Sequence, residues 1–176
     1  MYINFQTKFS LLLWFLIQIL INIHPLCVEE SMDFLMNAEG AIGGFLNSKA
    51  IICGGQYKSK IVMNDCLMID VNEAKISHKM STKRAFASSV TMYETSIWIT
   101  GGTNLSQSEC NSYSGKCIPL TSTEFFLFDG TKPGPDLPEP LRSHAMINVE
   151  DHLTMIIGGQ NDVEYCSDVS YSEYNA

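Results

Sequence analysis

Residues 96–103 read S-I-W-I-T-G-G-T, a short run of β-branched and aromatic side chains that stops at two glycines. Ile, Trp and Thr suit a pleated, half-buried surface, so this run predicts a β-strand. Glycine reaches positive φ without steric penalty, which suits an abrupt strand end. The same device recurs as A-I-I-C-G-G-Q at 50–56 and as T-M-I-I-G-G-Q at 154–160. Three copies predict a repeat protein whose defining residues are Gly54, Gly55, Gly101, Gly102, Gly158 and Gly159.

Each Gly-Gly pair stands at the same place in a longer pattern. An opening strand and a turn precede the strand that ends at the glycines, and a loop, a third strand and an edge strand follow. In the first repeat we expect strands near 40–45, 50–53, 66–70 and 75–78, with a turn at Asn47-Ser48. In the second repeat we expect 85–92, the strand of Trp98, and 123–129. The third repeat contributes strands near 155–157 and 169–174.

A proline-rich passage follows the third strand of the second repeat. Residues 132–140 read K-P-G-P-D-L-P-E-P. Proline cannot donate to a sheet ladder, so this passage predicts an outer edge or a connection between repeats.

The pattern resembles the kelch repeat over residues 39–174. Besides the glycine pairs, spaced by 47 and 57 residues against a period of about 50, the resemblance rests on two further features. Arg84 and Arg142 stand just upstream of the opening strands, and Ile69-Asp70 and Phe128-Asp129 stand at the aromatic-Asp position of the family. The family's tryptophan after that Asp is replaced by Ile76 in the first repeat and falls near Pro135 in the second.

The resemblance implies an all-β fold of kelch-type β-propeller blades, about three four-stranded antiparallel blades in an incomplete ring. Residues 39–80 form the first blade, 81–140 the second with an inserted loop at 104–120, and 141–176 a partial third. Propellers close with about four to eight blades. We therefore expect a fragment, a truncated product, or an arc that further blades or other chains complete. Such an arc exposes apolar surface on its flanks.

The N-terminus has the layout of a secretory signal peptide. One lysine in residues 1–8 precedes an apolar run at 9–23 and a polar break. We assign 1–27 to the signal peptide and 28–38 to a lead-in. The alternative is a membrane anchor, but the run falls short of the roughly 20 apolar residues that a span needs. The sequence thus predicts a secreted, extracellular protein.

In a secreted chain, the five cysteines beyond the signal peptide lie in an oxidising compartment, where disulfides persist. Cys53 and Cys66 flank one loop on neighbouring strands and predict a cross-strand disulfide, while Cys110 and Cys117 bracket a small loop that they close. Cys166 is left to pair with Cys27 or with sequence outside this chain. The alternative is free buried thiols that behave as small hydrophobes. Asn104 begins an N-L-S glycosylation acceptor triplet.

Charge and motif content argue against several classes of function. A formal net charge of −8 argues against nucleic acid, which requires a basic surface. The four histidines lack metal-ligand spacing, and neither a G-x-S-x-G nor a phosphate-binding glycine loop occurs. We expect no cofactor, no metal site and no enzymatic activity.

The resemblance implies protein binding, because most kelch domains bind proteins through loops at one end of the blades. Here those loops are 56–64, 104–120, 161–164, the passage around Lys83-Arg84, and 139–142. We therefore expect a non-enzymatic protein–protein interaction module with an unknown protein partner. The alternatives are loops without a partner, a secreted galactose-oxidase-like or carbohydrate-binding propeller whose active blades lie outside this chain, and a non-functional truncation product.

Overall fold

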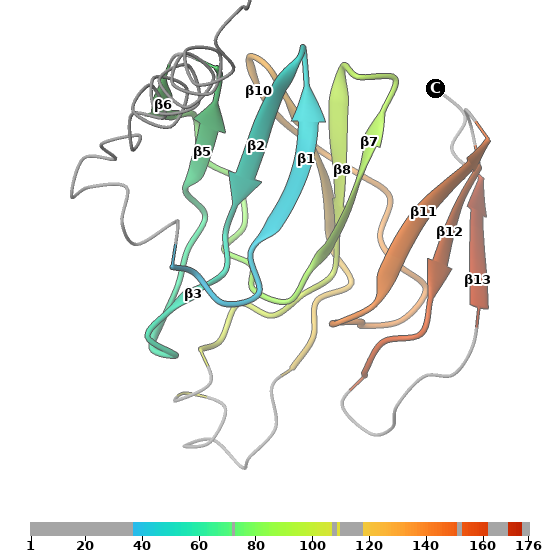
Figure 1. The fold of residues 1–176 in the computed structure, drawn as a ribbon. Coiled ribbons are helices and arrows are strands. Elements are labelled where there is room, and N and C mark those ends of the chain that lie inside the picture. Colours follow the sequence, from blue (N-terminus) through green and yellow to red (C-terminus); the bar gives the residue numbers. More distant parts are fainter. Residues whose placement is uncertain are drawn as a thin grey trace, which may run out of the picture.

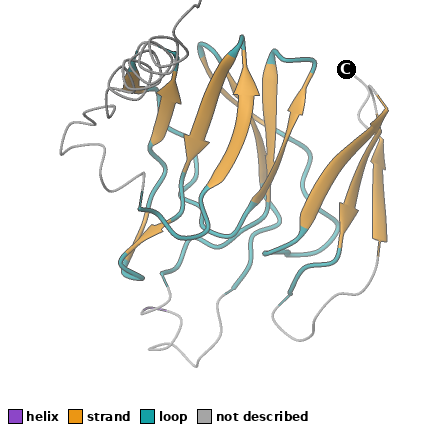
Figure 2. Cartoon of the chain, viewed as in Figure 1, coloured by secondary structure: helices purple, strands orange, loops and turns teal. Residues whose placement is uncertain are grey.

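A computed structural model describes residues 37–71, 73–106, 109, 118–150 and 153–161, and the backbone of 169–173 (Figure 1). The signal peptide expected at 1–27, nearly all of the lead-in, the Cys110/Cys117 loop and Cys166 lie outside these residues. The fold is all-β, and Figure 2 shows successive antiparallel sheets joined by loops.

The sheets follow one another along the chain, and we refer to each sheet with its connections as a unit. Unit 1 is a four-stranded sheet in the order β1 (Ile42–Leu46), β2 (Lys49–Cys53), β5 (Cys66–Ile69), β6 (Ala74–Ile76). Unit 2 repeats it with β7 (Ser88–Met92), β8 (Ser96–Thr100), β9 (Thr123–Leu127) and β10 (Gly130–Pro133). Unit 3 shows three strands, β11 (Ala145–Glu150), β12 (Leu153–Ile157) and β13 (Val169–Glu173).

Local chemistry explains the first hairpin of unit 1. The register pairs Leu46 with Lys49, so Asn47 and Ser48 form a two-residue turn. Both have positive φ, 48° and 62°, as a turn matching the right-handed twist of a hairpin requires. The turn expected at these two residues is therefore confirmed.

The sheets pack face to face, with unit 2 between the other two. Alternation along β8 directs Ile97 and Ile99 into an apolar cluster with unit 1, and Trp98 into a second cluster with unit 3. Phe126 joins the first cluster and Phe125 the second. Because both faces of this sheet are covered, β8 reads as an almost uninterrupted hydrophobic run.

Neighbouring sheets also meet along their first strands. β1 lies beside β7, and β7 beside β11. Ser89 donates its hydroxyl to the carbonyl of Gly43 over 2.7 Å, and the amide of Asn148 donates to the carbonyl of Thr91 over 2.7 Å. In the register of the first two strands of each unit, the two residues of each bond occupy the same position in successive units. The units are therefore repeated in their contacts as well as in their strands.

The structure corrects several details of the sequence interpretation. The loop expected at 56–64 contains a small hairpin of β3 (Gln56–Tyr57) and β4 (Ile61–Val62). Arg84 and Arg142 are not equivalent. The backbone carbonyls of Arg84 and Leu141 each accept the N–H of the second glycine of the preceding unit, so Leu141 takes the position of Arg84 in unit 3. Asp70 begins a four-residue turn whereas Asp129 lies in a two-residue turn, so these aspartates are not equivalent either.

The proline-rich passage divides between two roles. Its first residues belong to β10, whose register with β9 ends at Pro133 opposite Glu124. This strand lies at the edge of unit 2, where a missing N–H disturbs no ladder. The remainder, 134–140, connects unit 2 to unit 3.

Candidate interaction surface

The three glycine pairs stand at one end of the sheets, the lower end in Figure 1, where β3 also lies. All six have positive φ: 64° and 85° in unit 1, 59° and 86° in unit 2, and 62° and 114° in unit 3. The first glycine of a pair faces the next unit, since a Cβ on Gly54 would lie 2.5 Å from the carbonyl oxygen of Arg84. The second glycine faces its own unit, since a Cβ on Gly102 would lie 2.8 Å from the Cβ of Ala87. A side chain at the first glycine would therefore push the next unit away, and one at the second would displace the opening segment of its own unit.

Backbone hydrogen bonds link the units at this end. Gly55 donates its N–H to the carbonyl of Arg84 over 2.7 Å, and Gly102 donates to that of Leu141 over 2.8 Å. The Gly-Gly loops are therefore held by the opening segment of the following unit, and their position depends on it.

A buried ion pair anchors the segment between units 1 and 2. Arg84 Nε lies 2.9 Å from Glu124 Oε1, and both side chains are 1% exposed. The guanidinium also donates to the carbonyls of Gly101 and Ser122, over 2.8 and 2.7 Å. Glu124 accepts the backbone N–H and the hydroxyl of Ser81. The charges are thus compensated inside the protein, as buried charges must be.

A disulfide closes the loop between β2 and β5 of unit 1. Cys53 and Cys66 are bonded, as the sequence predicted, with their Cα atoms 4.1 Å apart on paired strands β2 and β5. The bond closes the segment 54–65, which carries the β3–β4 hairpin. A closed loop has fewer conformations to lose on binding, so a partner meets a preorganised surface.

The hairpin combines a polar base with an exposed tip. At its base, Glu39 Oε2 accepts hydrogen bonds from Gln56 Nε2 and Ser59 Oγ, each over 3.1 Å. At its tip, Lys58 and Lys60 are exposed, and Ile61 is 59% exposed. Lys58 Nζ lies 4.9 Å from the centre of the Tyr57 ring. An exposed apolar residue close in the chain to two cations is suited to a protein partner.

The loop of unit 2 begins with the glycosylation triplet. Asn104 is exposed, while Ser106 is fully buried. Ser106 donates its hydroxyl and its backbone N–H to Glu109, each over 2.7 Å. These bonds, first the hydroxyl and then the N–H, lower the pKa of Glu109. The acceptor asparagine is therefore accessible, but the hydroxyl of its triplet is engaged in the folded protein.

Among the residues that the structure describes, unit 3 carries two buried side-chain nitrogen atoms without a hydrogen-bond partner. Arg142 Nη2 donates to Gln160 Oε1 over 2.9 Å, while its Nε is unpartnered. His144 Nε2 lies 2.6 Å from Thr100 Oγ1, and its Nδ1 is unpartnered. Burial lowers the pKa of His144 to about 4, so the ring is neutral near pH 7. His144 is thus a core histidine between units 2 and 3.

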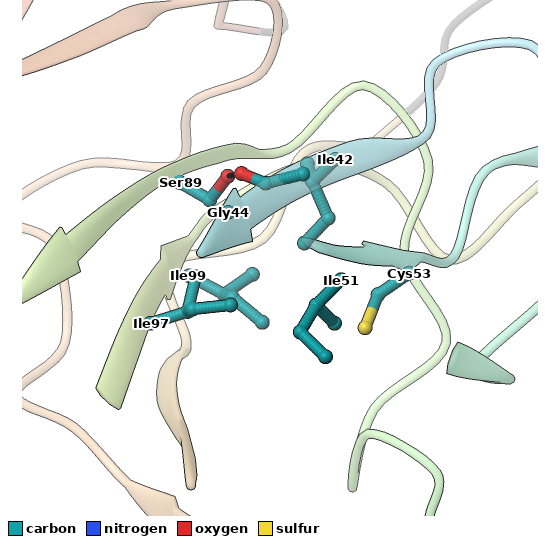
Figure 3. A pocket seen from close by; sticks show the side chains of 8 residues that line it. Ile42, Gly44, Ile51, Cys53, Ser89, Ile97 and Ile99 are labelled. Atoms are coloured by element: carbon teal, nitrogen blue, oxygen red, sulfur yellow. Dashed lines mark hydrogen bonds between the residues drawn. The ribbon is translucent and has the colours of Figure 1, made fainter. Parts of the chain in front are cut away.

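A narrow apolar space with no room for a water molecule lies between units 1 and 2 (Figure 3). It is bordered by Gly43 and Gly44 of β1, whereas the same positions of β7 hold Ser89 and Val90. Its only hydroxyl, that of Ser89, is already bound to the carbonyl of Gly43. Its walls are otherwise apolar, formed by Ile42, Ile51, Cys53, Ile97 and Ile99. The space is a packing gap and offers no polar group to orient a substrate.

The described residues contain no group of three His, Cys, Asp or Glu side chains that could hold a metal ion. In the same ranges, no helix is long and apolar enough to cross a membrane.

Comparison with known proteins gives a likeness of fold. No protein-family model matches the chain, and no curated protein matches it. Its fold is similar to a solved structure described as "Structure of YjhT", with a TM-score of 0.61 and 16% sequence identity. The match covers 77% of this chain and 46% of that chain, so this chain spans about half the length of its structural neighbour.

Sequence reasoning missed two features of this surface. The β3–β4 hairpin has only two residues in each strand, too few for any periodicity to be visible. The pairing of Arg84 with Glu124 joins residues 40 positions apart, and Glu124 stands in an otherwise apolar run. The charge of Glu124 within that apolar run was the signal for a buried ion pair, since a buried charge requires a partner.

Proposed function

We propose that the chain is a secreted, non-enzymatic protein of the kelch type whose units are propeller blades, and that it binds a protein partner through the loops at the Gly-Gly end. Two features support the propeller: consecutive antiparallel sheets packed face to face, and contacts between the first strands of neighbouring sheets.

The main support for protein binding is the disulfide-closed loop between β2 and β5. A disulfide of this kind is suited to an oxidising compartment, in agreement with the expected secretion. The loop presents Lys58, Lys60 and Ile61 on a rigid base, on a protein whose formal net charge is −8. A partner with a small apolar patch bordered by carboxylates would fit this tip.

The direct test begins with the chain produced through a secretory pathway and screened against extracellular proteins. For any binder, the affinities of two variants are then compared. Ile61→Asp changes the hairpin tip, and Tyr93→Asp changes a residue of similar exposure in the β7–β8 turn, at the opposite end of the sheets. We expect at least a tenfold loss for the first and little change for the second, because a charge at the centre of an interface is poorly tolerated.

Equal losses for both variants would contradict the assignment of the surface. Stabilisation of the protein by soluble sugars, in the absence of any protein binder, would favour a carbohydrate-binding propeller instead. Retention of the unprocessed chain inside cells would contradict secretion.

A further inference from the structure

We infer that the outer face of unit 3 is a docking surface for unit 1 of a second copy of this chain, in a closed two-fold dimer. The inference rests on the propeller arrangement proposed above but not on the loop surface. The outer face consists of apolar residues on two strands: Ala145 and Ile147 of β11, and Leu153, Met155 and Ile157 of β12.

Alternation along the strands defines this face. Met146 and Ile156 belong to the apolar cluster with unit 2, so the residues beside them point the other way. On that other side, Ile147 is 48% exposed and pairs with Met155 across the hairpin. The face therefore presents a cross-strand apolar pair without a cover in the part of the chain that the structure describes.

The same positions are covered in units 1 and 2. Met155 corresponds to Ile51 and Trp98, which are 1% and 2% exposed. Ile157 corresponds to Cys53 and Thr100, both buried, while Met155 and Ile157 are only half-buried. The difference arises because Ile51 packs against unit 2 and Trp98 against unit 3. The exposed face is thus one half of an interface that the molecule already forms twice.

Unit 1 carries the other half of the interface. Unit 2 contacts unit 1 through Ile97, Ile99 and Phe126, whose counterparts in unit 1 are Ala50, Ile52 and Ile69. These three counterparts are apolar and half-buried, on the face of unit 1 that points away from unit 2. A second copy therefore supplies the complementary surface with the same residue chemistry.

Closure favours a dimer over an open series. Two copies related by a two-fold axis form the interface twice and leave no free face. Their six units lie within the range of about four to eight in which propellers close.

The repeat specifies one contact across the dimer. A Cβ on Gly44 would lie 2.7 Å from Cδ1 of Ile97, so positions 44 and 97 touch between units 1 and 2. Their counterparts are Ile147 in unit 3 and Ala50 in unit 1. Ile147 of one copy is therefore expected to lie against Ala50 of the other.

The first test is the molar mass of the full secreted chain by light scattering at micromolar concentration. We expect a discrete dimer that Ile147→Asp weakens at least tenfold. Phe128→Asp, a change at a residue of similar exposure in the β9–β10 turn, is expected to leave the dimer intact. A monomer or an open-ended series of oligomers would overturn the inference, while leaving the loop-binding proposal open to its own test.

The second test does not depend on the folding of an aspartate variant. Chains carrying Ile147→Cys and chains carrying Ala50→Cys are mixed and oxidised. A disulfide-linked dimer that forms in the mixture, and not in either variant alone, supports the contact. Equal cross-linking in the single-variant samples would overturn it.

Discussion

Arg84 and Glu124 pair at 2.9 Å although 40 residues separate them along the chain. Arg84 belongs to the segment that joins the first two sheets, and Glu124 lies on the third strand of the second. The backbone carbonyl of Arg84 also accepts the N–H of Gly55 in unit 1. The segment that holds Arg84 is therefore bonded both to unit 1 and to unit 2. The ion pair therefore sets where the Gly-Gly loops stand.

Loss of this pair is expected to destabilise the protein strongly. Arg84→Met leaves the Glu124 carboxylate buried without its cation, which costs about 3–5 kcal/mol in comparable cases. The free energy of unfolding in urea measures it. The control is Lys75→Met, which removes an exposed pair with Glu73 and is expected to change stability by less than about 1 kcal/mol. Similar losses for both variants would show that burial gives the Arg84 pair no special weight.

Alanine at the first glycine of unit 2 is also expected to destabilise. Gly101 has φ 59°, and its Cβ would overlap the carbonyl oxygen of Leu141. Backbone strain in this region costs about 1–3 kcal/mol, before the displacement of unit 3 is counted. Gly130→Ala is the matched control, because a Cβ there meets no atom within 4 Å. Thermal unfolding of both variants compares them, and an unchanged midpoint for Gly101→Ala would contradict the contact between units.

The disulfide is expected to contribute to stability independently of the ion pair. Its cysteines are 13 residues apart, and closing a loop of about that size is worth roughly 3 kcal/mol. The double variant Cys53→Ala, Cys66→Ala is expected to lose that amount in urea unfolding under oxidising conditions. Under reducing conditions the difference from the unsubstituted protein should shrink. A difference that persists fully after reduction would assign the loss to packing of the buried sulfurs instead.

Acid is expected to weaken the contact between units 2 and 3 through His144. Burial lowers its pKa to about 4 in the folded protein, against about 6.5 in the unfolded chain. Since the unfolded state then binds more protons, stability falls as pH drops from about 6.5 to about 4, by at most about 1.4 kcal/mol per pH unit. Urea midpoints across this range measure the slope.

His144→Gln is the control for that slope, because it removes the titrating ring and leaves the carboxylates in place. We expect this variant to show a shallower loss of stability between pH 6.5 and 4 than the unsubstituted protein. Identical slopes would mean that other groups account for the acid sensitivity.

Glycosylation of Asn104 is expected to depend on the folding state. The asparagine is exposed, but the hydroxyl of Ser106 is buried and bound to Glu109. A glycan would therefore be attached to the nascent chain and not to the folded protein. The mass of the chain produced through a secretory pathway, before and after glycosidase treatment, tests for the glycan, with Asn104→Gln as control. Modification of prefolded, unglycosylated protein would contradict the role of the buried hydroxyl.

The sequence by itself determined the features that depend on neighbouring residues. Paired glycines predicted the strand ends, Asn47-Ser48 predicted a hairpin turn, and the β-branched runs predicted the strands of an all-β fold. Cys53 and Cys66 were predicted as partners because the strands that hold them are joined by one short loop. Each of these signals lies within about a dozen residues, the range over which backbone preference and hydrophobic alternation act.

The tertiary structure alone decided which residues meet across units. Arg84 and Arg142 both stand just before an opening strand, yet they occupy positions one residue apart in their units, and among the described residues only Arg84 forms a buried ion pair. Likewise Ile51 and Met155 follow the same local pattern, but only the first is covered. Burial depends on which sheet lies opposite, and that is set by packing between segments some 50 residues apart rather than by the strand itself.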